Sequence, residues 1–238
     1  MGAQWKHAGR LASSTAKGRI FSKLAKELAI AAKSGADPTL NARLRAVIEA
    51  AKKVSMPKDT LERAIKKGAG LLDERIEYET VTYEGFGPHR VPVIVECLTD
   101  NNKRTSTNIR HHFRNGQLSP VAWDYAHVGL VDASPAEGAS APSAEQIEEA
   151  AIEAGAQDFE AGAADVEGGV RFYTEPTDVD AVAKALSAHG WTVATMRIGW
   201  RPKNPVAVPD AAARTEVEQF LHELDEDDDV QYIYPALA

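Results

Sequence analysis

The chain has 238 residues, of which 44% are hydrophobic, and a formal net charge of −8. This length can bury a real core and favours one or two domains. Cys97 is the only cysteine, which excludes an intrachain disulfide and a cysteine zinc site and fits a reducing, cytoplasmic location. No apolar run approaches the roughly 20 residues that span a bilayer, so no membrane partner is expected.

The charge is divided unevenly along the chain. Residues 1–70 hold fifteen Lys and Arg against five Asp and Glu, a net of +10, whereas the remainder carries −18. A polyphosphate partner gives a physical reason to gather cations at one end. The sequence therefore predicts a nucleic-acid-binding first domain followed by acidic α+β domains. The first 26 residues contain no acid, which also suits an organelle transit peptide, but a helix that begins within them favours a folded start.

The first domain is predicted to consist of three short helices. Ile20, Leu24 and Leu28 recur at the spacing of one helix face. Gly35 is placed to end that helix, and Pro57 is a favoured first-turn residue. The expected helices span residues 16–34, 38 or 41 to 54, and 57–67.

Beyond residue 70 the pattern changes to alternating strands and helices. Strands are expected at 78–84, 91–98, 121–125, 128–132, near 158 and 165, and at 170–174, 192–200 and 230–234. Helices are expected at 104–114, 144–154, 179–189 and 211–224. Residues 85–88 read as a turn, and residues 134–143, rich in Ala, Pro, Ser and Gly, as a linker.

This order predicts an α+β fold of three domains, an N-terminal helical domain followed by two ferredoxin-like α+β domains. Residues 91–132 together with the last helix and strand complete the order strand, helix, strand, strand, helix, strand. The other α+β unit is then inserted into this layer. The predicted domains are residues 1–76, residues 77–133 with 202–238, and residues 134–201.

The cations of the first domain are the predicted phosphate contacts. Arg19, Lys23 and Lys26 are spaced four and three apart, so they share one helix stripe. Such a stripe binds phosphates with salt-dependent affinity and reads little of the nucleotide sequence. The alternative is that these Lys and Arg side chains only keep the helix surface solvated. The predicted nucleic-acid-binding residues are Lys6, Lys17, Arg19, Lys23, Lys26, Lys33, Arg43, Arg45, Lys52, Lys53, Lys66, Lys67, Lys103 and Arg104.

Two further features could contact nucleic acid. Trp5 could stack on an exposed base, or it could tether the start of the chain by packing. Residues 100–105 lead into a helix whose free N–H groups, with Lys103 and Arg104, could hold a phosphate. Ordinary helix capping by Asp100 or Asn101 explains the same residues.

No catalytic residue, metal ligand or cofactor site is predicted. His111 and His112 are helix neighbours about 100° apart, which is poor geometry for one metal, and Cys97 reads as a buried, inert thiol. Residues 85–88 lack the spacing and Lys of a P-loop. The acidic run 225–229 lacks the Gly and closing Glu of a calcium loop. It is interpreted as a surface turn that could repel nucleic acid and orient a partner on the opposite side.

The chain resembles the YebC family, also called PmpR, whose mitochondrial relatives include a translational activator of cytochrome oxidase. The matching motifs are KGRIFSKL at 17–24, NARLR at 41–45, MPKD at 56–59, ERAIKKG at 62–68, YEGFGP at 83–88, VIVECLTDN at 93–101, VAW at 121–123 and DDDVQ at 227–231. They cover nearly the full length in order. The resemblance implies a three-domain fold, with a helical first domain and two α+β domains.

The chain departs from the family near its start, where Ala3-Gln4-Trp5 replaces the usual Ser-Lys-Trp, and this indicates a divergent paralogue. The family carries two functional labels, a DNA-binding transcriptional regulator and a translation factor that binds the ribosome. The cations lie on several helices rather than on one recognition helix, which favours structured RNA.

We therefore expect a non-enzymatic, cytoplasmic nucleic-acid-binding regulator that associates with ribosomal RNA and eases elongation. The alternative is a DNA-binding transcriptional regulator. A more remote one is a small-molecule sensor or enzyme in which the basic domain only serves oligomerisation. A monomer is expected, although the sequence leaves the oligomeric state open.

Overall fold

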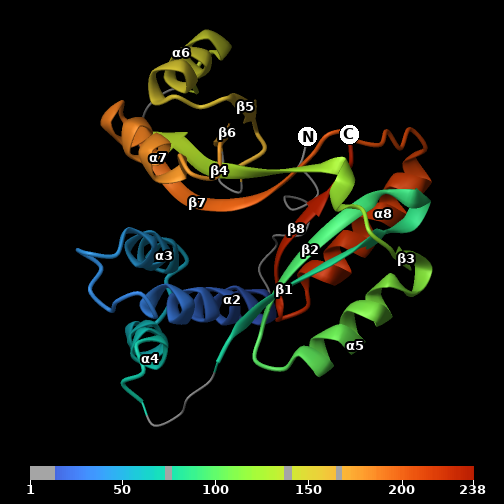
Figure 1. Ribbon diagram of the computed structural model, residues 1–238, viewed down its shortest axis with the longest axis horizontal. Coiled ribbons are helices and arrows are strands. Elements are labelled where there is room, and N and C mark those ends of the chain that lie inside the picture. Colours follow the sequence, from blue (N-terminus) through green and yellow to red (C-terminus); the bar gives the residue numbers. More distant parts are fainter. Residues whose placement is uncertain (1–13, 73–76, 137–140, 165–167) are drawn as a thin grey trace.

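The computed structural model describes residues 14–72, 77–136, 141–164 and 168–238. Figure 1 shows a group of helices beside two four-stranded sheets, each covered by helices on one face. This arrangement confirms the predicted α+β class with a helical N-terminal domain. Trp5, Lys6 and the strand expected near residue 165 lie outside the described residues.

The helical domain comprises α2 (Ser14–Ala32), α3 (Ala42–Lys53) and α4 (Lys58–Gly68), close to the predicted positions. Leu28, Leu44 and Ala51 are fully buried at its centre. Asn41 fixes the start of α3, because its side chain accepts a hydrogen bond from the Leu44 N–H and donates another, 2.7 Å long, to the Ala31 carbonyl of α2. The capping residue thus also sets how α3 meets α2.

The first sheet has the strand order β3-β1-β2-β8, with every neighbouring pair antiparallel. Helices α5 and α8 cover one face, where Val95, Ile109 and Leu221 are completely buried. Strand β2 is buried on both faces, as its continuous apolar run predicts. The elements are β1 (Glu79–Phe86), β2 (Pro92–Thr99), α5 (Asn102–His112), β3 (Gln117–Leu118), α8 (Ala211–Asp225) and β8 (Val230–Pro235).

The second sheet has the order β5-β6-β4-β7, and its chain order of strand, helix, strand, strand, helix, strand is ferredoxin-like. Its first and last strands are neighbours, so the chain enters and leaves the sheet side by side. Helices α6 and α7 pack over Phe172 and Leu186. The elements are β4 (Tyr125–Pro135), α6 (Ala144–Ala154), β5 (Asp158–Ala161), β6 (Val170–Thr174), α7 (Val179–Ala188) and β7 (Trp191–Pro202).

Three local expectations were wrong. Residues 128–132 do not join the first layer but form the middle of β4 in the second sheet, and β1 with β3 take their place. Residues 122–124 form a short 3-10 helix instead of a strand, because the Glu84 carboxylate accepts the Val121 and Ala122 N–H groups at 2.8 Å. Strand β1 runs on through Phe86, since β3 pairs with it, and the turn follows at Pro88–Arg90.

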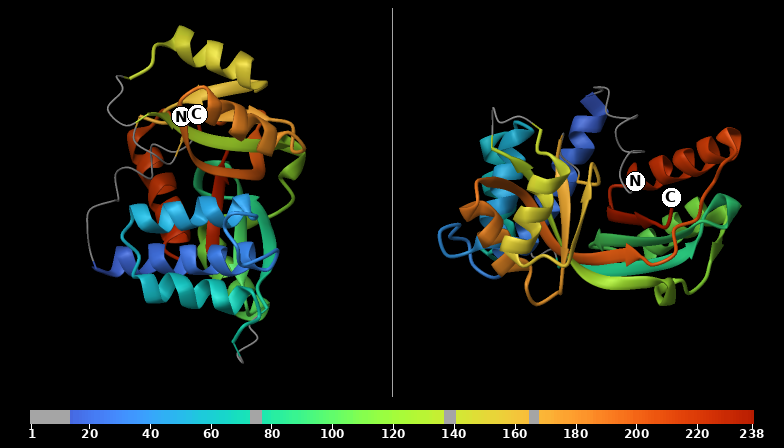
Figure 2. Two further views of the ribbon diagram at one scale, coloured as in Figure 1. Left: turned by 90° about the vertical axis from the view of Figure 1, so that its left-hand side faces the viewer. Right: turned by 90° about the horizontal axis from the view of Figure 1, so that it is seen from above.

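The uncovered faces of the two sheets meet each other. Ile94 and Tyr234 of the first sheet pack against Leu130 and Tyr173 of the second. Glu96 lies within this junction, accepting hydrogen bonds from Trp200 Nε1 at 3.0 Å and from the Tyr234 hydroxyl at 3.1 Å. The helical domain closes against the same region, as the two further views of Figure 2 show, and Tyr232 of β8 donates a 2.6 Å hydrogen bond to Glu27 of α2.

Candidate nucleic-acid interface

The basic stripe of α2 lies against the acidic run that ends α8. Lys26 Nζ is 2.6 Å from Asp229 Oδ1, Lys23 Nζ is 2.9 Å from Asp225 Oδ1, and Arg19 pairs with Glu226. The Lys23 and Lys26 side chains are only 17% and 13% exposed. The charges of these three cations are therefore compensated by carboxylates within the chain.

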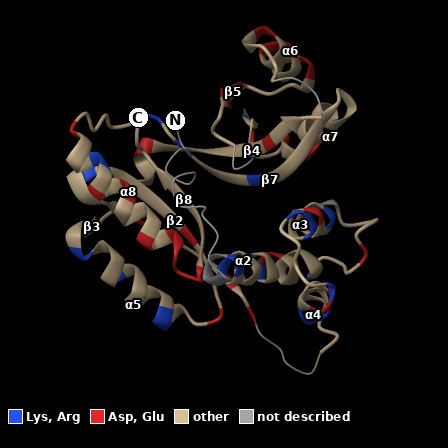
Figure 3. Cartoon of the chain, turned by 180° about the vertical axis from the view of Figure 1, so that it is seen from behind, with Lys and Arg blue, Asp and Glu red and all other residues tan. Residues whose placement is uncertain are grey.

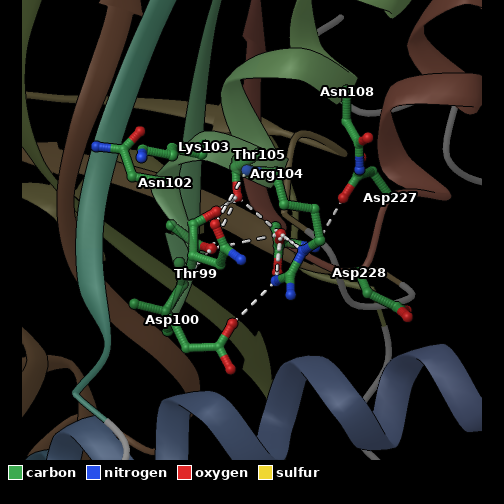
Figure 4. Close-up of polar contacts among 12 residues, drawn as sticks. Thr99, Asp100, Asn102, Lys103, Arg104, Thr105, Asn108, Asp227 and Asp228 are labelled. Carbon is green, nitrogen blue, oxygen red and sulfur yellow. Dashed lines mark hydrogen bonds and ion pairs between the residues drawn. The ribbon is translucent and has the colours of Figure 1, made fainter.

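Asp229 is the centre of this contact, and its side chain is only 3% exposed. In addition to Lys26, it accepts hydrogen bonds from Arg104 Nη2 and from the Thr105 hydroxyl, both 2.8 Å from Oδ2. Figure 4 shows Thr99, at the end of β2, pointing toward Arg104 and Thr105, at the start of α5. A buried carboxylate with two cations and hydroxyl donors has its charge and lone pairs satisfied.

The acidic run 225–229 was wrongly expected to be a solvated surface turn. Asp227 is also buried at the side chain, and it accepts a 3.2 Å hydrogen bond from Asn108 Nδ2 and lies 3.4 Å from His112 Nε2. Only Glu226 and Asp228 of the run are exposed. The run therefore joins three elements, α2, α5 and α8, and we refer to these contacts as the acidic clasp.

The start of α5 is capped by the chain itself. The Asn101 side chain accepts a hydrogen bond from the Arg104 N–H, and Arg104 Nη2 is 3.0 Å from Asp100 Oδ1. The capping interpretation of residues 100–105 thus accounts for these groups, and Arg104 is held by two carboxylates. Lys103, by contrast, is exposed and has no ion pair among the described residues.

The clasp lowers the pKa of two aspartates. Burial alone would raise the pKa of Asp229, but the hydrogen bonds from Lys26, Arg104 and Thr105 outweigh it, and the pKa lies below the ordinary value. Burial likewise opposes ionisation of Asp227, and the hydrogen bond with His112 helps to bring its pKa below the ordinary value. Both carboxylates are charged in the folded protein at neutral pH.

Acidification should remove the contribution of Asp229 to stability. Because its folded-state pKa is depressed, the contribution is complete above the ordinary aspartate pKa of about 3.9 and is lost as the pH falls below that value. The difference in unfolding free energy between the unchanged chain and Asp229→Asn should be constant at neutral pH and shrink in acid. Denaturant titrations across this range measure the difference. An equal difference at about pH 3 and about pH 7 would contradict the assignment.

Most of the other predicted cations are exposed. On α3, Arg45 and Lys52 share one stripe with Lys53 beside it, and Lys52 carries only a surface ion pair with Glu49, 2.8 Å long. Such exposed pairs contribute little stability and leave the cation open to a phosphate. The predicted cations that the structure leaves exposed are Lys17, Lys33, Arg43, Arg45, Lys52, Lys53, Lys66 and Lys103, besides Arg104, which is held by carboxylates.

Two of the predicted cations, Arg43 and Lys67, lie apart from the exposed stripe of α3. Arg43 lines a cavity of about 640 Å³ between the helical domain and the two sheets, and Val47 and Arg197 also line it. Lys67 is half-buried, with its Nζ 5.6 Å from the centre of the Tyr78 ring. The predicted set therefore does not form one continuous face.

The histidines and the cysteine considered in the sequence have contacts within the protein. The His111 and His112 rings are 6.3 Å apart and face different partners, Arg114 and Asp227. Within the described ranges, no group of His, Cys, Asp and Glu is arranged to hold a metal ion. Cys97 is completely buried, as predicted, and burial raises the pKa of its thiol. Among the described helices, none is both long and apolar enough to cross a membrane.

The sequence reasoning missed two exposed arginines, Arg110 and Arg114 of the α5 region. Both follow the first turn of this helix, which holds the predicted contacts Lys103 and Arg104. The spacing of seven and four residues after Lys103 was the available signal, since it keeps all three cations on one side of a helix. Trp123 was also missed as a surface residue, and it is 69% exposed.

Comparison with known protein families covers nearly the whole chain. Residues 3–71 match the TACO1/YebC protein N-terminal domain, and residues 78–237 match the TACO1/YebC second and third domain. The chain belongs to the TACO1/YebC family. The boundary between the two matches falls where the helical domain ends and β1 begins.

Relatives of this TACO1/YebC protein span its full length. It is 56% identical to a probable transcriptional regulatory protein of Pseudomonas fluorescens (strain Pf0-1), with all of both chains covered. Proteins of the same description from Polaromonas sp. and Bdellovibrio bacteriovorus are 54% and 46% identical, again over both full chains. A crystal structure of a conserved hypothetical protein, Aq1575 from Aquifex aeolicus, is 36% identical and superposes with a TM-score of 0.80. It covers 93% of this chain and 90% of that one.

Proposed function

We propose that this chain regulates gene expression by binding nucleic acid through phosphate contacts of its helical domain, without catalysing a reaction. The observation that carries the proposal is the group of exposed cations on α3 and α4, which includes Lys52, Lys53 and Lys66. Full-length relatives described as probable transcriptional regulatory proteins support the regulatory part. Each phosphate neutralised by such a cation releases counterions and adds affinity.

Within this proposal, structured ribosomal RNA is the target, and the protein acts in the cytoplasm as a translation factor that eases elongation. The exposed cations belong to α2, α3, α4 and α5 rather than to one helix. A distribution over several elements suits a folded RNA backbone better than one recognition helix in a DNA groove. The second candidate, a DNA-binding transcriptional regulator, is supported by the descriptions of the relatives.

Reversing three cations tests the proposal. Replacing Lys52, Lys53 and Lys66 with glutamate should weaken RNA binding and lower the slope of log affinity against log salt by about 2 to 3. All three side chains lie outside the acidic clasp, so the fold should persist, which circular dichroism checks. The matched control is Lys184→Glu, whose side chain on α7 is 71% exposed. If the RNA affinity and the salt slope of the triple variant equal those of the control, the proposed surface does not bind RNA.

Two assays distinguish the targets. Sedimentation with ribosomes and binding to duplex promoter fragments should be compared at one salt concentration, because affinities at different salt are not comparable. A ribosomal RNA target predicts co-sedimentation that the triple variant loses. Selective binding to one promoter without co-sedimentation would favour the transcriptional alternative.

A further inference from the structure

The outer side of α5 carries a cationic stripe that continues into the following turn. Lys103, Thr107 and Arg110 are separated by four and three residues, so they lie on one side of the helix, and Arg114 follows in the short 3-10 helix Phe113–Asn115. All four side chains are exposed. Residues 102–115 contain no Asp or Glu, and Figure 3 shows Lys and Arg, without acidic residues, on α5. We call these four residues the α5 stripe.

The opposite side of the same helix is bound to carboxylates. Arg104, Asn108 and His112, each four residues apart, contact Asp229 or Asp227 of the acidic clasp. Thr105 and Ile109 are buried beneath the helix. Asp227 and Asp229 therefore contact the inner side of α5. This arrangement leaves the outer cations without ion pairs in the described part of the chain and holds the helix against α8.

The outer cations have few competing partners. Among the described residues, Lys103 and Arg110 make no ion pair, and Arg114 Nη1 only approaches His111 Nε2 at 3.1 Å. Thr107 donates its hydroxyl to the Lys103 carbonyl at 2.9 Å, which ties the first turns together. Three positive charges on a segment that contains no Asp or Glu are complementary to a polyanion.

We propose that the α5 stripe is a second phosphate-binding surface, which contacts the backbone of the same nucleic acid that the helical domain binds. This inference rests on the proposed function. Along the axis of α5, Lys103 and Arg110 are about 10 Å apart, and Arg114 follows in the next turn, so the stripe can contact two or three successive phosphates. Contacts of this type position a nucleic acid without reading its sequence.

The position of α5 allows both surfaces to act together. In Figure 1, α4 and α5 lie on the same, lower side of the molecule, on either side of the start of β1. The acidic clasp fixes the helical domain to the first sheet through Lys26 and Arg104, which share Asp229. Two surfaces fixed relative to each other bind one long ligand with a high effective concentration at the second contact. The clasp would thus serve binding indirectly, by keeping the two surfaces in register.

The test replaces Arg110 and Arg114 with glutamine, which removes both charges and keeps a good helix former at position 110. With a structured ribosomal RNA fragment, the salt slope should fall by about 2, and binding should weaken by a similar factor for different RNA sequences. The matched control is Lys184→Gln on α7. Thermal unfolding shows whether the variants keep the stability of the unchanged chain.

The outcomes separate this inference from the proposed function. If the Lys52, Lys53 and Lys66 variant weakens binding while the arginine variant keeps the affinity and slope of the unchanged chain, the α5 stripe is not a binding surface and the proposed function stands. If the unchanged chain binds neither RNA nor DNA, both are wrong. Loss of slope in each variant, and a larger loss when they are combined, supports both.

Discussion

Replacing Asp229 with alanine should lower the free energy of unfolding by about 3 kcal/mol, the lower end of the range for breaking a buried ion pair. The substitution leaves Lys26, whose side chain is 13% exposed, without its carboxylate partner. It also removes one acceptor of the buried Thr105 hydroxyl, which keeps the Asn101 carbonyl oxygen at 3.1 Å. Arg104 is 48% exposed and can turn to water, which is why we expect the lower end. Urea unfolding followed by circular dichroism measures the difference.

The neighbouring residue supplies the control. Asp228 has the same charge and is exposed, so Asp228→Ala should change stability by no more than about 0.5 kcal/mol. Asp229→Asn keeps the shape of the side chain and an acceptor for Thr105 but removes the charge. Its loss should fall between the two alanine variants. Equal stabilities of Asp228→Ala and Asp229→Ala would show that the clasp does not hold the helical domain.

The sequence was informative where structure is decided locally. Helices α2, α3 and α4 were predicted close to their observed bounds because apolar spacing, Asn41 and Pro57 act within a few residues. The assignment of residues 128–132 failed because the choice of sheet partner is made over long separations. An apolar strand can complete either sheet. Residues 128–132 join the second sheet because β4 pairs with β7 along Tyr125–Pro135.

The ion pairs of the α2 cations could not be predicted from the sequence for the same reason. Lys23 and Lys26 meet their carboxylates across about two hundred residues of sequence, and nothing local marks that pairing. One signal was available, because the acidic run lies between Leu224 and Val230, both of which are completely buried. A five-residue segment with both ends buried in a core cannot extend into solvent. Its charges therefore need cationic partners within the protein, and the α2 stripe supplies them.

Replacing Gly68 with alanine should destabilise the helical domain by about 3 kcal/mol or more, the upper end of the usual effect of overpacking. A β-carbon at this position would lie 1.9 Å from the carbonyl oxygen of Ala29 and 2.6 Å from its Cα. Both atoms belong to the backbone of α2, which no side-chain rotation can move. The gain of about 1 kcal/mol in helix propensity does not offset this overlap. Helices α2 and α4 must separate, and the cations of α3 and α4 lose their fixed positions.

The control is a second helical glycine, Gly18 of α2, where an added β-carbon meets nothing within 4 Å. Gly18→Ala should be neutral or stabilising by up to about 1 kcal/mol. Hydrogen exchange should show faster exchange in α2, α3 and α4 of the Gly68 variant. Strands β2 and β4 should stay protected, since their cores contain none of the residues of the helical core. Equal protection of the helices in the two variants would mean that α2 and α4 do not cross in contact at Gly68.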